Sequence, residues 1–228
     1  MQIAADFKPD LRIAGSDGMD FYSISNFDKN PARVKKGLQW EIDAWSAGQR
    51  EWRDVCANAF FLIGNHEDRL RRYLWRNPEL FDLEVLRLPS LLRMAELGIH
   101  WETDKGERAN QELVVHNRLV IKHGSLTRKH SAYTARGELE AEGFSISLLS
   151  AHTHRGGSTY QRTRRGVVHA HESFCLCSLE PEYLQHPNWQ QGIVLATVTP
   201  TALSIEPVPF FRETGKVRAI WREKEYVE

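Results

Sequence analysis

Four short segments of this 228-residue chain combine carboxylate, amide and imidazole side chains, which are groups that bind divalent metal ions. Each segment directly follows a predicted buried strand. In open α/β sheets, ligands bind outside the carboxyl ends of the strands, so we expect the four loops to meet around one ion or ion pair. The segments are residues 16–20 (Ser-Asp-Gly-Met-Asp), 64–68 (Gly-Asn-His-Glu-Asp), 122–124 (Lys-His-Gly) and 151–154 (Ala-His-Thr-His).

Each signal has a structural alternative when it is taken alone. Asp17 and Asp20 are typical of turns and helix caps, and a histidine at a strand end, such as His123, is more often structural. The Gly-Asn-His-Glu run is stronger, because the end of a buried strand has little structural need for three consecutive polar side chains. The His-x-His pair is similar, since two imidazoles on one side of an extended segment can hold one metal ion. Their occurrence together on one chain favours a metal site of Mn, Fe or Zn over a pure oxygen or thiolate site.

The elements that must position these loops alternate between strands and helices in the first two thirds of the chain. Short apolar runs predict strands, and apolar residues recurring every three or four positions predict helices. The expected strands are 10–15, 59–63, 112–122 (one or two strands), 144–149, 167–179, 192–198 and 202–208. The expected helices are 37–59, 68–76, 89–97 and 132–141.

The sequence indicates one domain over residues 1–228. Metal-site motifs occupy residues 15–155, and a mainly β part occupies residues 156–228, with the tail at 216–228 either a last strand or a loose end. No internal repeat and no linker rich in Pro, Gly or Ser divides the chain.

Composition excludes several classes of protein. Thirty basic residues balance thirty acidic ones, so net charge gives no argument for a nucleic-acid or lipid partner. The apolar runs fall far short of the roughly 18 residues that span a bilayer, and the charged first twenty residues do not resemble a signal peptide. We therefore expect no membrane partner. The three cysteines, Cys56, Cys175 and Cys177, do not make a disulfide set, which favours a reducing, cytoplasmic setting.

The order Asp-x-x-Asp, Gly-Asn-His-Glu, His-Gly and His-x-His, over roughly residues 10–156, resembles the calcineurin-like metallophosphoesterase superfamily. Residues 20–28 (Asp-Phe-Tyr-Ser-Ile-Ser-Asn-Phe-Asp) resemble a branch found in phage and bacterial genomes, which would imply the host cytoplasm for a phage protein. The resemblance implies an α/β fold, a four-layer αββα sandwich of two mixed β-sheets flanked by helices. It also implies metal-dependent hydrolysis of phosphoesters.

The resemblance implies metal ligation by five residues, Asp17, Asn65, His123, His152 and His154. Asp17 would bridge two ions, and His154 would belong to the second. The implied cofactor is a pair of divalent ions, with Mn favoured and Fe, Zn, Ni or Mg as alternatives. This chain lacks the Asp-x-His motif with which the superfamily usually opens. Either the chain begins late, without an N-terminal strand, or the second site is depleted and binds its ion much more weakly, so that this chain would hold one ion instead of two.

The resemblance also implies that His66 faces the scissile phosphate as general acid or charge stabiliser, with Glu67 or Asp20 orienting it. Two arginines, Arg69 and Arg155, are candidate phosphate contacts, although arginines at such positions are more often solvated.

The substrate prediction depends on a basic stretch in the C-terminal half. Residues 162–165 (Arg-Thr-Arg-Arg), with Lys129 and Arg155, would form a rim for DNA or RNA, and Tyr160 or a tryptophan would stack on a base. A solvated strand face explains this stretch equally well. We slightly favour a nuclease or phosphodiesterase over a nucleotide or protein phosphatase. The alternative is an impaired or non-catalytic module that binds phosphate or nucleic acid on a partial metal site. The oligomeric state is not indicated.

A second His-x-His, at His169 and His171, lies in a predicted strand together with Cys175 and Cys177. We expect a structural role for this pair, because a single strand lacks the turns that would fold four donors around a tetrahedral zinc ion. The seven tryptophans are expected to pack in the core.

Overall fold

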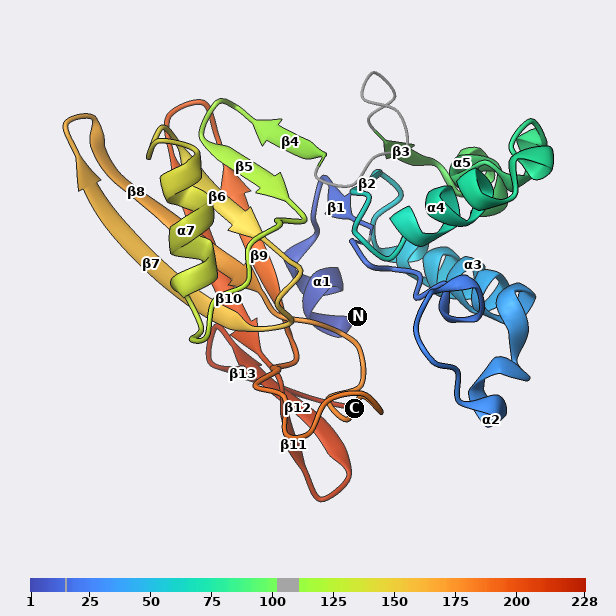
Figure 1. The fold of residues 1–228 in the computed structure, drawn as a ribbon. Coiled ribbons are helices and arrows are strands. Elements are labelled where there is room, and N and C mark those ends of the chain that lie inside the picture. The colour runs from blue at the N-terminus through green and yellow to red at the C-terminus, as the bar shows by residue number, and fades with distance from the viewer. Residues whose placement is uncertain (15, 102–110) are drawn as a thin grey trace. The chain divides into compact units, whose positions relative to one another are not determined.

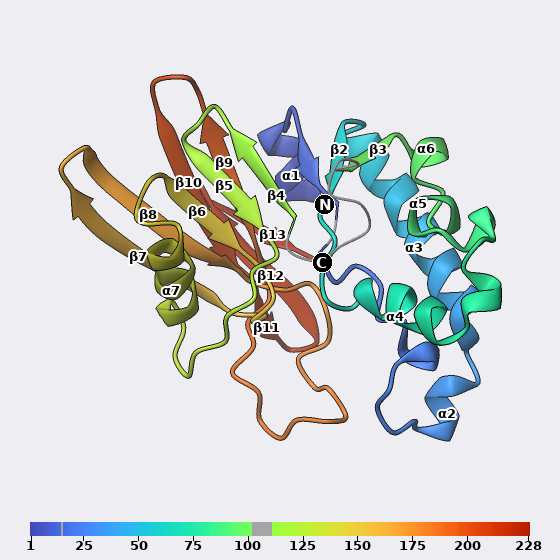
Figure 2. The ribbon, with the colours of Figure 1, turned by 45° about the horizontal axis from the view of Figure 1, so that its top comes forward.

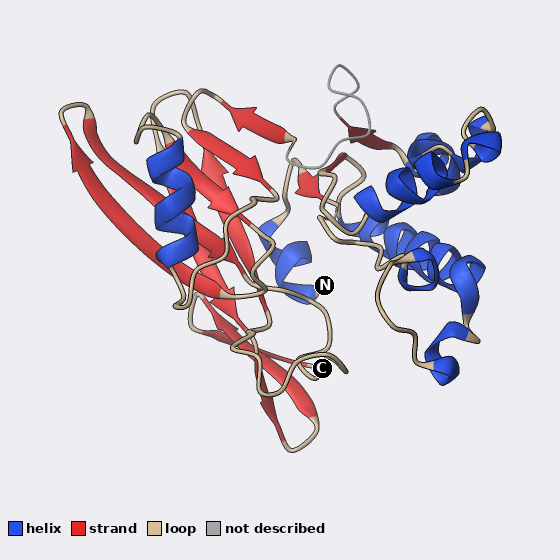
Figure 3. Cartoon of the chain, in the orientation of Figure 1, coloured by secondary structure: helices blue, strands red, loops and turns tan. Residues whose placement is uncertain are grey.

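The computed structural model describes residues 1–14, 16–101 and 111–228 of the chain. The chain divides into two compact units, residues 1–111 (unit 1) and 112–228 (unit 2), and each is described by itself. Both combine helices with β-sheet, so the α/β class is confirmed. Figure 3 shows that most helices belong to unit 1 and most strands to unit 2. The four-layer sandwich and the single domain stay predictions.

Unit 1 contains a three-stranded parallel sheet in the order β1-β2-β3 (Figure 1). Its strands are β1 (Arg12–Ile13), β2 (Ala59–Phe61) and β3 (Ile99–Trp101). Its helices are α1 (Gln2–Phe7), α2 (Pro31–Val34), α3 (Gly37–Val55), α4 (Asp68–Arg76), α5 (Leu88–Leu91) and α6 (Met94–Leu97), with 3-10 turns at Tyr22–Ile24, Pro78–Leu80 and Glu84–Leu86. Parallel pairing of β1 with β2 brings their carboxyl ends to one edge of the sheet.

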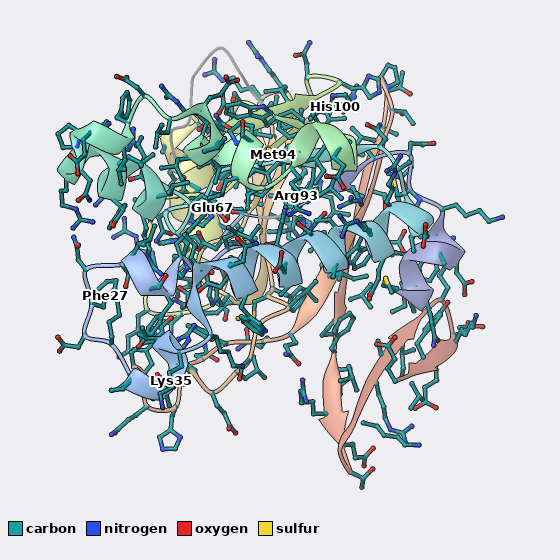
Figure 4. All side chains as sticks on the ribbon, turned by 90° about the vertical axis from the view of Figure 1, so that its right-hand side faces the viewer. Phe27, Lys35, Glu67, Arg93, Met94 and His100 are labelled. Atoms are coloured by element: carbon teal, nitrogen blue, oxygen red, sulfur yellow. The ribbon has the colours of Figure 1, made fainter. Side chains whose placement is uncertain are left out.

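The core of unit 1 explains why the long helix α3 forms. Ile42 and Trp45 are buried one turn apart, and the Trp45 ring meets the edge of Phe61 with ring centroids 5.4 Å apart. An apolar stripe facing a sheet is the pattern that stabilises an amphipathic helix. In Figure 4, Glu67 and Met94 lie in the interior of unit 1, whereas Phe27 and Lys35 lie at its periphery.

Unit 2 contains a five-stranded mixed sheet in the order β4-β5-β6-β8-β7 (Figure 1). Strands β5, β6 and β8 are parallel neighbours, and β4 and β7 are antiparallel edges. A β9-β10 hairpin and a β11-β12-β13 sheet follow. The strands are β4 (Glu112–Val115), β5 (Leu119–Lys122), β6 (Ser147–Ser150), β7 (Gly156–Thr163), β8 (Gly166–Ser173), β9 (Gly192–Val198), β10 (Leu203–Pro209), β11 (Phe211–Glu213), β12 (Lys216–Trp221) and β13 (Lys224–Val227).

Helix α7 (Tyr133–Ala141) covers one face of this mixed sheet, as Figures 1 and 2 both show. Its buried Ala135 and Leu139 pack against Leu148 of β6 and Ala170 of β8. The helix therefore stabilises β6, which precedes the loop of His152 and His154, and β8, which contains His169 and His171.

Several elements differ from the sequence predictions. The expected helix 89–97 is two short helices, because Arg93 takes a left-handed conformation (φ 53°) between them. Helix α1 was not predicted. The tail forms the β12-β13 hairpin rather than a loose end. Strand β8 ends at Ser173, so the expected strand 167–179 is too long. Among the described residues, no helix is both long and apolar enough to cross a membrane.

Candidate functional site

Unit 1 brings two of the predicted motifs together. The loops after the parallel neighbours β1 and β2 carry Asp17 and His66, and the His66 backbone N–H donates to Asp17 Oδ1 at 3.0 Å. The Asp17 side chain is only 7% exposed. The Asp17 carboxylate is therefore fixed in position by a hydrogen bond from the backbone of the second motif.

The Glu67 side chain holds the loops after β1 and β2 together. Its buried carboxylate accepts hydrogen bonds from the backbone N–H groups of Gly64 (2.8 Å), Met19 (3.0 Å) and Asp17 (3.2 Å). Burial, with the nearby charge of Asp17, raises the pKa of Glu67 to about 7, although the hydrogen bonds oppose this shift. Glu67 thus positions the Asp17 loop, and no contact of its carboxylate with the His66 ring is found among the described residues.

The His66 ring lies between two carboxylates. Its Nδ1 is 3.3 Å from Asp20 Oδ1, and its Nε2 is 4.0 Å from Asp17 Oδ2. Asp20 also accepts hydrogen bonds from the Arg69 and Arg33 guanidinium groups. Burial opposes ionisation of Asp20, but the hydrogen bond and charge of His66 and the charges of the two arginines together lower its pKa to about 2. Of the two residues expected to orient His66, Asp20 makes the ring contact.

Glycine is required where the two loops approach each other. A Cβ atom on Gly64 would lie 2.2 Å from Asp17 Oδ1 and 2.6 Å from the Asp17 backbone nitrogen. Asp17 itself takes a left-handed conformation with φ 57°. Non-glycine residues hold such a conformation only where the surroundings enforce it, which is common at functional sites. Asn65, next to Gly64, is exposed.

Unit 2 brings together two other motifs, after the parallel neighbours β5 and β6. The Ala151 backbone N–H donates to the carbonyls of Lys122 (3.3 Å) and His123 (3.0 Å), which joins the two loops. The imidazoles of His123 and His152 lie edge to face with ring centroids 4.8 Å apart. His152 has a left-handed backbone with φ 72°. Two imidazoles this close are a typical pair of metal donors.

Helix α7 supports the His123 loop through one buried carboxylate. Glu138 accepts the backbone N–H groups of Ser125 (2.7 Å) and Leu126 (2.8 Å) and pairs with Lys122 Nζ at 2.9 Å. Burial opposes ionisation of Glu138, but these bonds lower its pKa below the ordinary value. The residues that follow His123 are therefore bound to the same helix that packs on β6 and β8.

His154, the second histidine of the 151–154 segment, has partners that the sequence analysis did not predict. His154 Nδ1 lies 3.7 Å from Cys177 Sγ, and the His154 ring meets the edge of Trp189 with centroids 4.3 Å apart. Ligand atoms of His154, Cys175 and Cys177 all lie within 4.8 Å of one another. A hydrogen bond from the Cys175 thiol, followed by the His154 interactions, lowers the pKa of Cys177 to about 5 against the effect of burial, and the pKa of Cys175 is raised. The Cys-x-Cys spacing of Cys175 and Cys177 was the only feature of the sequence that pointed to this cluster.

The second His-x-His forms a hydrogen-bonded chain on β7 and β8. His171 Nδ1 lies 2.8 Å from Ser158 Oγ, and His171 Nε2 lies 2.8 Å from His169 Nδ1. Burial, with the charge of His169, lowers the pKa of His171 to about 4, so the ring is neutral at pH 7. Both ring nitrogens of His171 are engaged within the protein.

The two candidate phosphate contacts differ in what their guanidinium groups bind. Arg155 is buried and donates to the carbonyls of Lys129 (3.0 Å) and Arg128 (2.8 Å), so it ties two loops of unit 2 together. Arg69 donates to the Asp20 carbonyl at 2.6 Å and to the Asp20 carboxylate. We therefore do not assign a substrate contact to Arg155.

Comparison with protein-family models finds no match, and comparison with curated proteins finds none either. Among solved structures, a double mutant of Vps29 from Entamoeba histolytica is similar over 82% of this chain and 85% of that chain, with 12% sequence identity and a TM-score of 0.35.

Proposed function

We propose that this protein is a metal-dependent phosphoesterase. The observation that carries the proposal is His66, whose ring is held between Asp20 and Asp17 directly after a buried strand. An imidazole with a carboxylate on one nitrogen and its other nitrogen turned toward a candidate metal ligand is arranged for proton transfer beside a metal centre. The motif order of the sequence supports the same function.

The donor chemistry of the predicted ligands fits a divalent transition metal. Unit 1 offers the Asp17 carboxylate and the Asn65 amide, and unit 2 offers the imidazoles of His123 and His152. On the motif order of the sequence, we propose that these four residues hold one ion, with Mn favoured. Such an ion, when bound, supplies Lewis acidity that lowers the pKa of water and holds phosphate oxygens.

His66 and Asp20 would together supply a proton to the leaving group. Asp20 is ionised at neutral pH and accepts from His66 Nδ1, which directs the other ring nitrogen away from Asp20. Protonated His66 would donate from Nε2 to the leaving oxygen, and Asp20 would stabilise the imidazolium. Glu67 would hold the Asp17 backbone in place throughout.

The test is hydrolysis of bis(p-nitrophenyl) phosphate and of p-nitrophenyl phosphate with Mn²⁺, for the wild type and His66→Ala. We expect the loss of general acid catalysis to lower kcat by about 10²- to 10⁴-fold. The matched control is His100→Ala, at an exposed histidine of the same unit, and it should keep wild-type kcat. Metal-stimulated hydrolysis that survives His66→Ala unchanged, or its absence from the wild type, would refute the proposal.

A basic, aromatic hairpin favours a nucleic-acid phosphodiester as substrate. Arg162, Arg164 and Arg165 are exposed around the β7-β8 turn, and exposed Tyr160 stacks on His169 with centroids 5.6 Å apart. Cationic side chains bind backbone phosphates, and aromatic rings stack on unpaired bases. The same hairpin would serve a non-catalytic nucleic-acid-binding module, which is the alternative.

Binding of single-stranded DNA, measured by fluorescence anisotropy at several salt concentrations, tests this substrate. Replacing the three arginines by glutamine should weaken binding and reduce the salt dependence by about one phosphate contact per arginine removed. Arg50→Gln, at an exposed arginine of unit 1 paired with Glu96, is the control. Equal affinity of the triple variant and the wild type would exclude the hairpin as the binding surface.

A further inference from the structure

The cluster of His154, Cys175 and Cys177 has the spacing of a metal site. Zinc bonds of about 2.3 Å to sulfur and 2.0–2.1 Å to nitrogen, at tetrahedral angles, place a sulfur and a nitrogen ligand about 3.6 Å apart. Cys177 Sγ and His154 Nδ1 are 3.7 Å apart, and every ligand-atom pair of the cluster lies within 4.8 Å. Only a small movement of side chains would bring all three onto one ion.

The backbone around the cluster is fixed by a network of hydrogen bonds. The Gln190 N–H donates to the His154 carbonyl at 2.9 Å, and the Cys175 N–H donates to the Gln190 carbonyl at 3.1 Å. Gln191 Nε2 donates to the Cys177 carbonyl at 2.6 Å. The three ligand-bearing positions thus belong to one bonded framework within unit 2, and they do not depend on unit 1.

The turn that the sequence did not predict creates this arrangement. Strand β8 ends at Ser173, and Phe174 takes a left-handed conformation with φ 64°. The chain therefore leaves the strand before Cys175, and the two thiols come to the His154 side of the unit. The expectation that Cys175 and Cys177 lie inside the strand with His169 and His171 was therefore wrong.

We propose that His154, Cys175 and Cys177 form a mononuclear zinc site with three protein ligands and one position left for water or an incoming ligand. Thiolate and imidazole donors together select Zn²⁺ over Mn²⁺, which prefers oxygen ligands. Cys177 is exposed, so the fourth position is open to solvent. The Trp189 ring covers one side of His154. The ion would link the segment after β8 to the loop before β7.

This site goes beyond the proposed function, because it uses a second metal of different chemistry and needs unit 2 alone. If the chain hydrolyses phosphoesters, His154 would then bind zinc with two thiolates rather than join the Mn²⁺ ligands. The two proposals are separable, since a thiolate site has a spectroscopic signature that an oxygen and nitrogen site lacks.

The test loads the purified, reduced full-length protein with Co²⁺ in place of Zn²⁺ and records its absorption. We expect a near-ultraviolet thiolate-to-cobalt charge-transfer band that Zn²⁺ abolishes, and one Zn²⁺ fewer per chain in Cys175→Ser/Cys177→Ser than in the wild type. Cys56→Ser, which changes the third cysteine, and His186→Ala, at an exposed histidine of the same connecting segment, should keep the band. His66→Ala should also keep it, whatever its effect on hydrolysis.

Alkylation of the wild type tests the site without any substitution. Bound Zn²⁺ should slow the reaction of Cys175 and Cys177 with iodoacetamide tenfold or more, as read by peptide mass spectrometry. Equal alkylation with and without Zn²⁺, or absence of the charge-transfer band, would each overturn the proposal.

Discussion

At the scale of single residues, the titration of Glu67 makes the stability of the fold around the candidate site depend on pH. The carboxyl is buried, and its pKa of about 7 exceeds the ordinary value of 4.5, so between these values the folded state holds a proton that the unfolded state has lost. The stabilisation is complete below pH 4.5 and is lost as the pH rises through 7. Its size is on the order of 3 kcal/mol for this pKa difference.

We therefore predict that the free energy of unfolding of the metal-free wild type falls between pH 5 and pH 7.5. In Glu67→Gln the decline should flatten, because glutamine does not titrate. The variant should also be less stable at pH 5, since its amide keeps one acceptor oxygen for three backbone N–H groups. Urea unfolding in a chelator measures both effects. Glu51→Gln, on the exposed face of α3, should keep the wild-type decline.

Gly64 gives a second prediction at this scale. In Gly64→Ala the new methyl group would overlap Asp17 Oδ1 and the Asp17 backbone nitrogen, so the loop must move. We expect a loss of stability of about 1–3 kcal/mol and at least tenfold weaker Mn²⁺ binding, measured by urea unfolding and calorimetry. Gly48→Ala in α3 meets no atom within 4 Å and should gain about 0.5–1 kcal/mol without changing Mn²⁺ binding. Equal Mn²⁺ affinity of the two variants would contradict the role of Asp17.

At the scale of elements, helix α7 fixes the loop that carries His123 through the buried Glu138. In Glu138→Ala two backbone N–H groups lose their acceptor, while Lys122 keeps Glu142 at 2.8 Å. We predict a loss of about 3 kcal/mol. Amide exchange of Ser125 and Leu126 should become faster.

The control for this prediction is Glu140→Ala on the same helix, where an exposed glutamate pairs with Arg136. Its cost should stay within about 0.5 kcal/mol, with unchanged amide exchange of the His123 loop. If both variants exchange at the same rate, Glu138 does not fix the loop.

Elements with a strong local signal were predicted well from the sequence. Helix α4 has the expected bounds, because Asn77-Pro78 stops it, and strand β9 spans the expected residues. The elements that were missed depend on backbone conformations that local sequence does not encode. Arg93 and Phe174 both adopt a left-handed backbone that glycine ordinarily supplies, and tertiary packing must enforce it.

The same limit applies to the candidate site. The order of the motifs placed Asp17 beside the residue 64–68 motif, and His123 beside His152, because parallel neighbouring strands end at the same edge. The partners of His154 could not be predicted, since they come from a segment beyond an unexpected turn. The burial of Arg155 could not be predicted either, because it depends on hydrogen bonds to the carbonyls of Arg128 and Lys129, which are distant in the sequence.

At the scale of the whole molecule, the prediction of one domain has a direct test. Five of the seven tryptophans lie in unit 1, and the longest strands lie in unit 2. Tryptophan fluorescence therefore reports mainly on unit 1, and the far-ultraviolet β signal reports mainly on unit 2. We predict coincident urea transitions by the two probes in Mn²⁺, because the proposed ligands come from both units and binding links their folding. Separate midpoints would show that the units fold independently.

The segment between β8 and β9 has its two ends clamped together, since the Gly192 N–H donates to the Cys175 carbonyl and the Cys175 N–H to the Gln190 carbonyl. Between these ends, Gln185 and His186 are exposed. Because closure entropy rises only slowly with loop length, extra residues placed there cost little once the ends are joined. The junction of Gln185 and His186 is therefore where this protein would accept an inserted peptide or reporter domain while the rest of unit 2 keeps its fold.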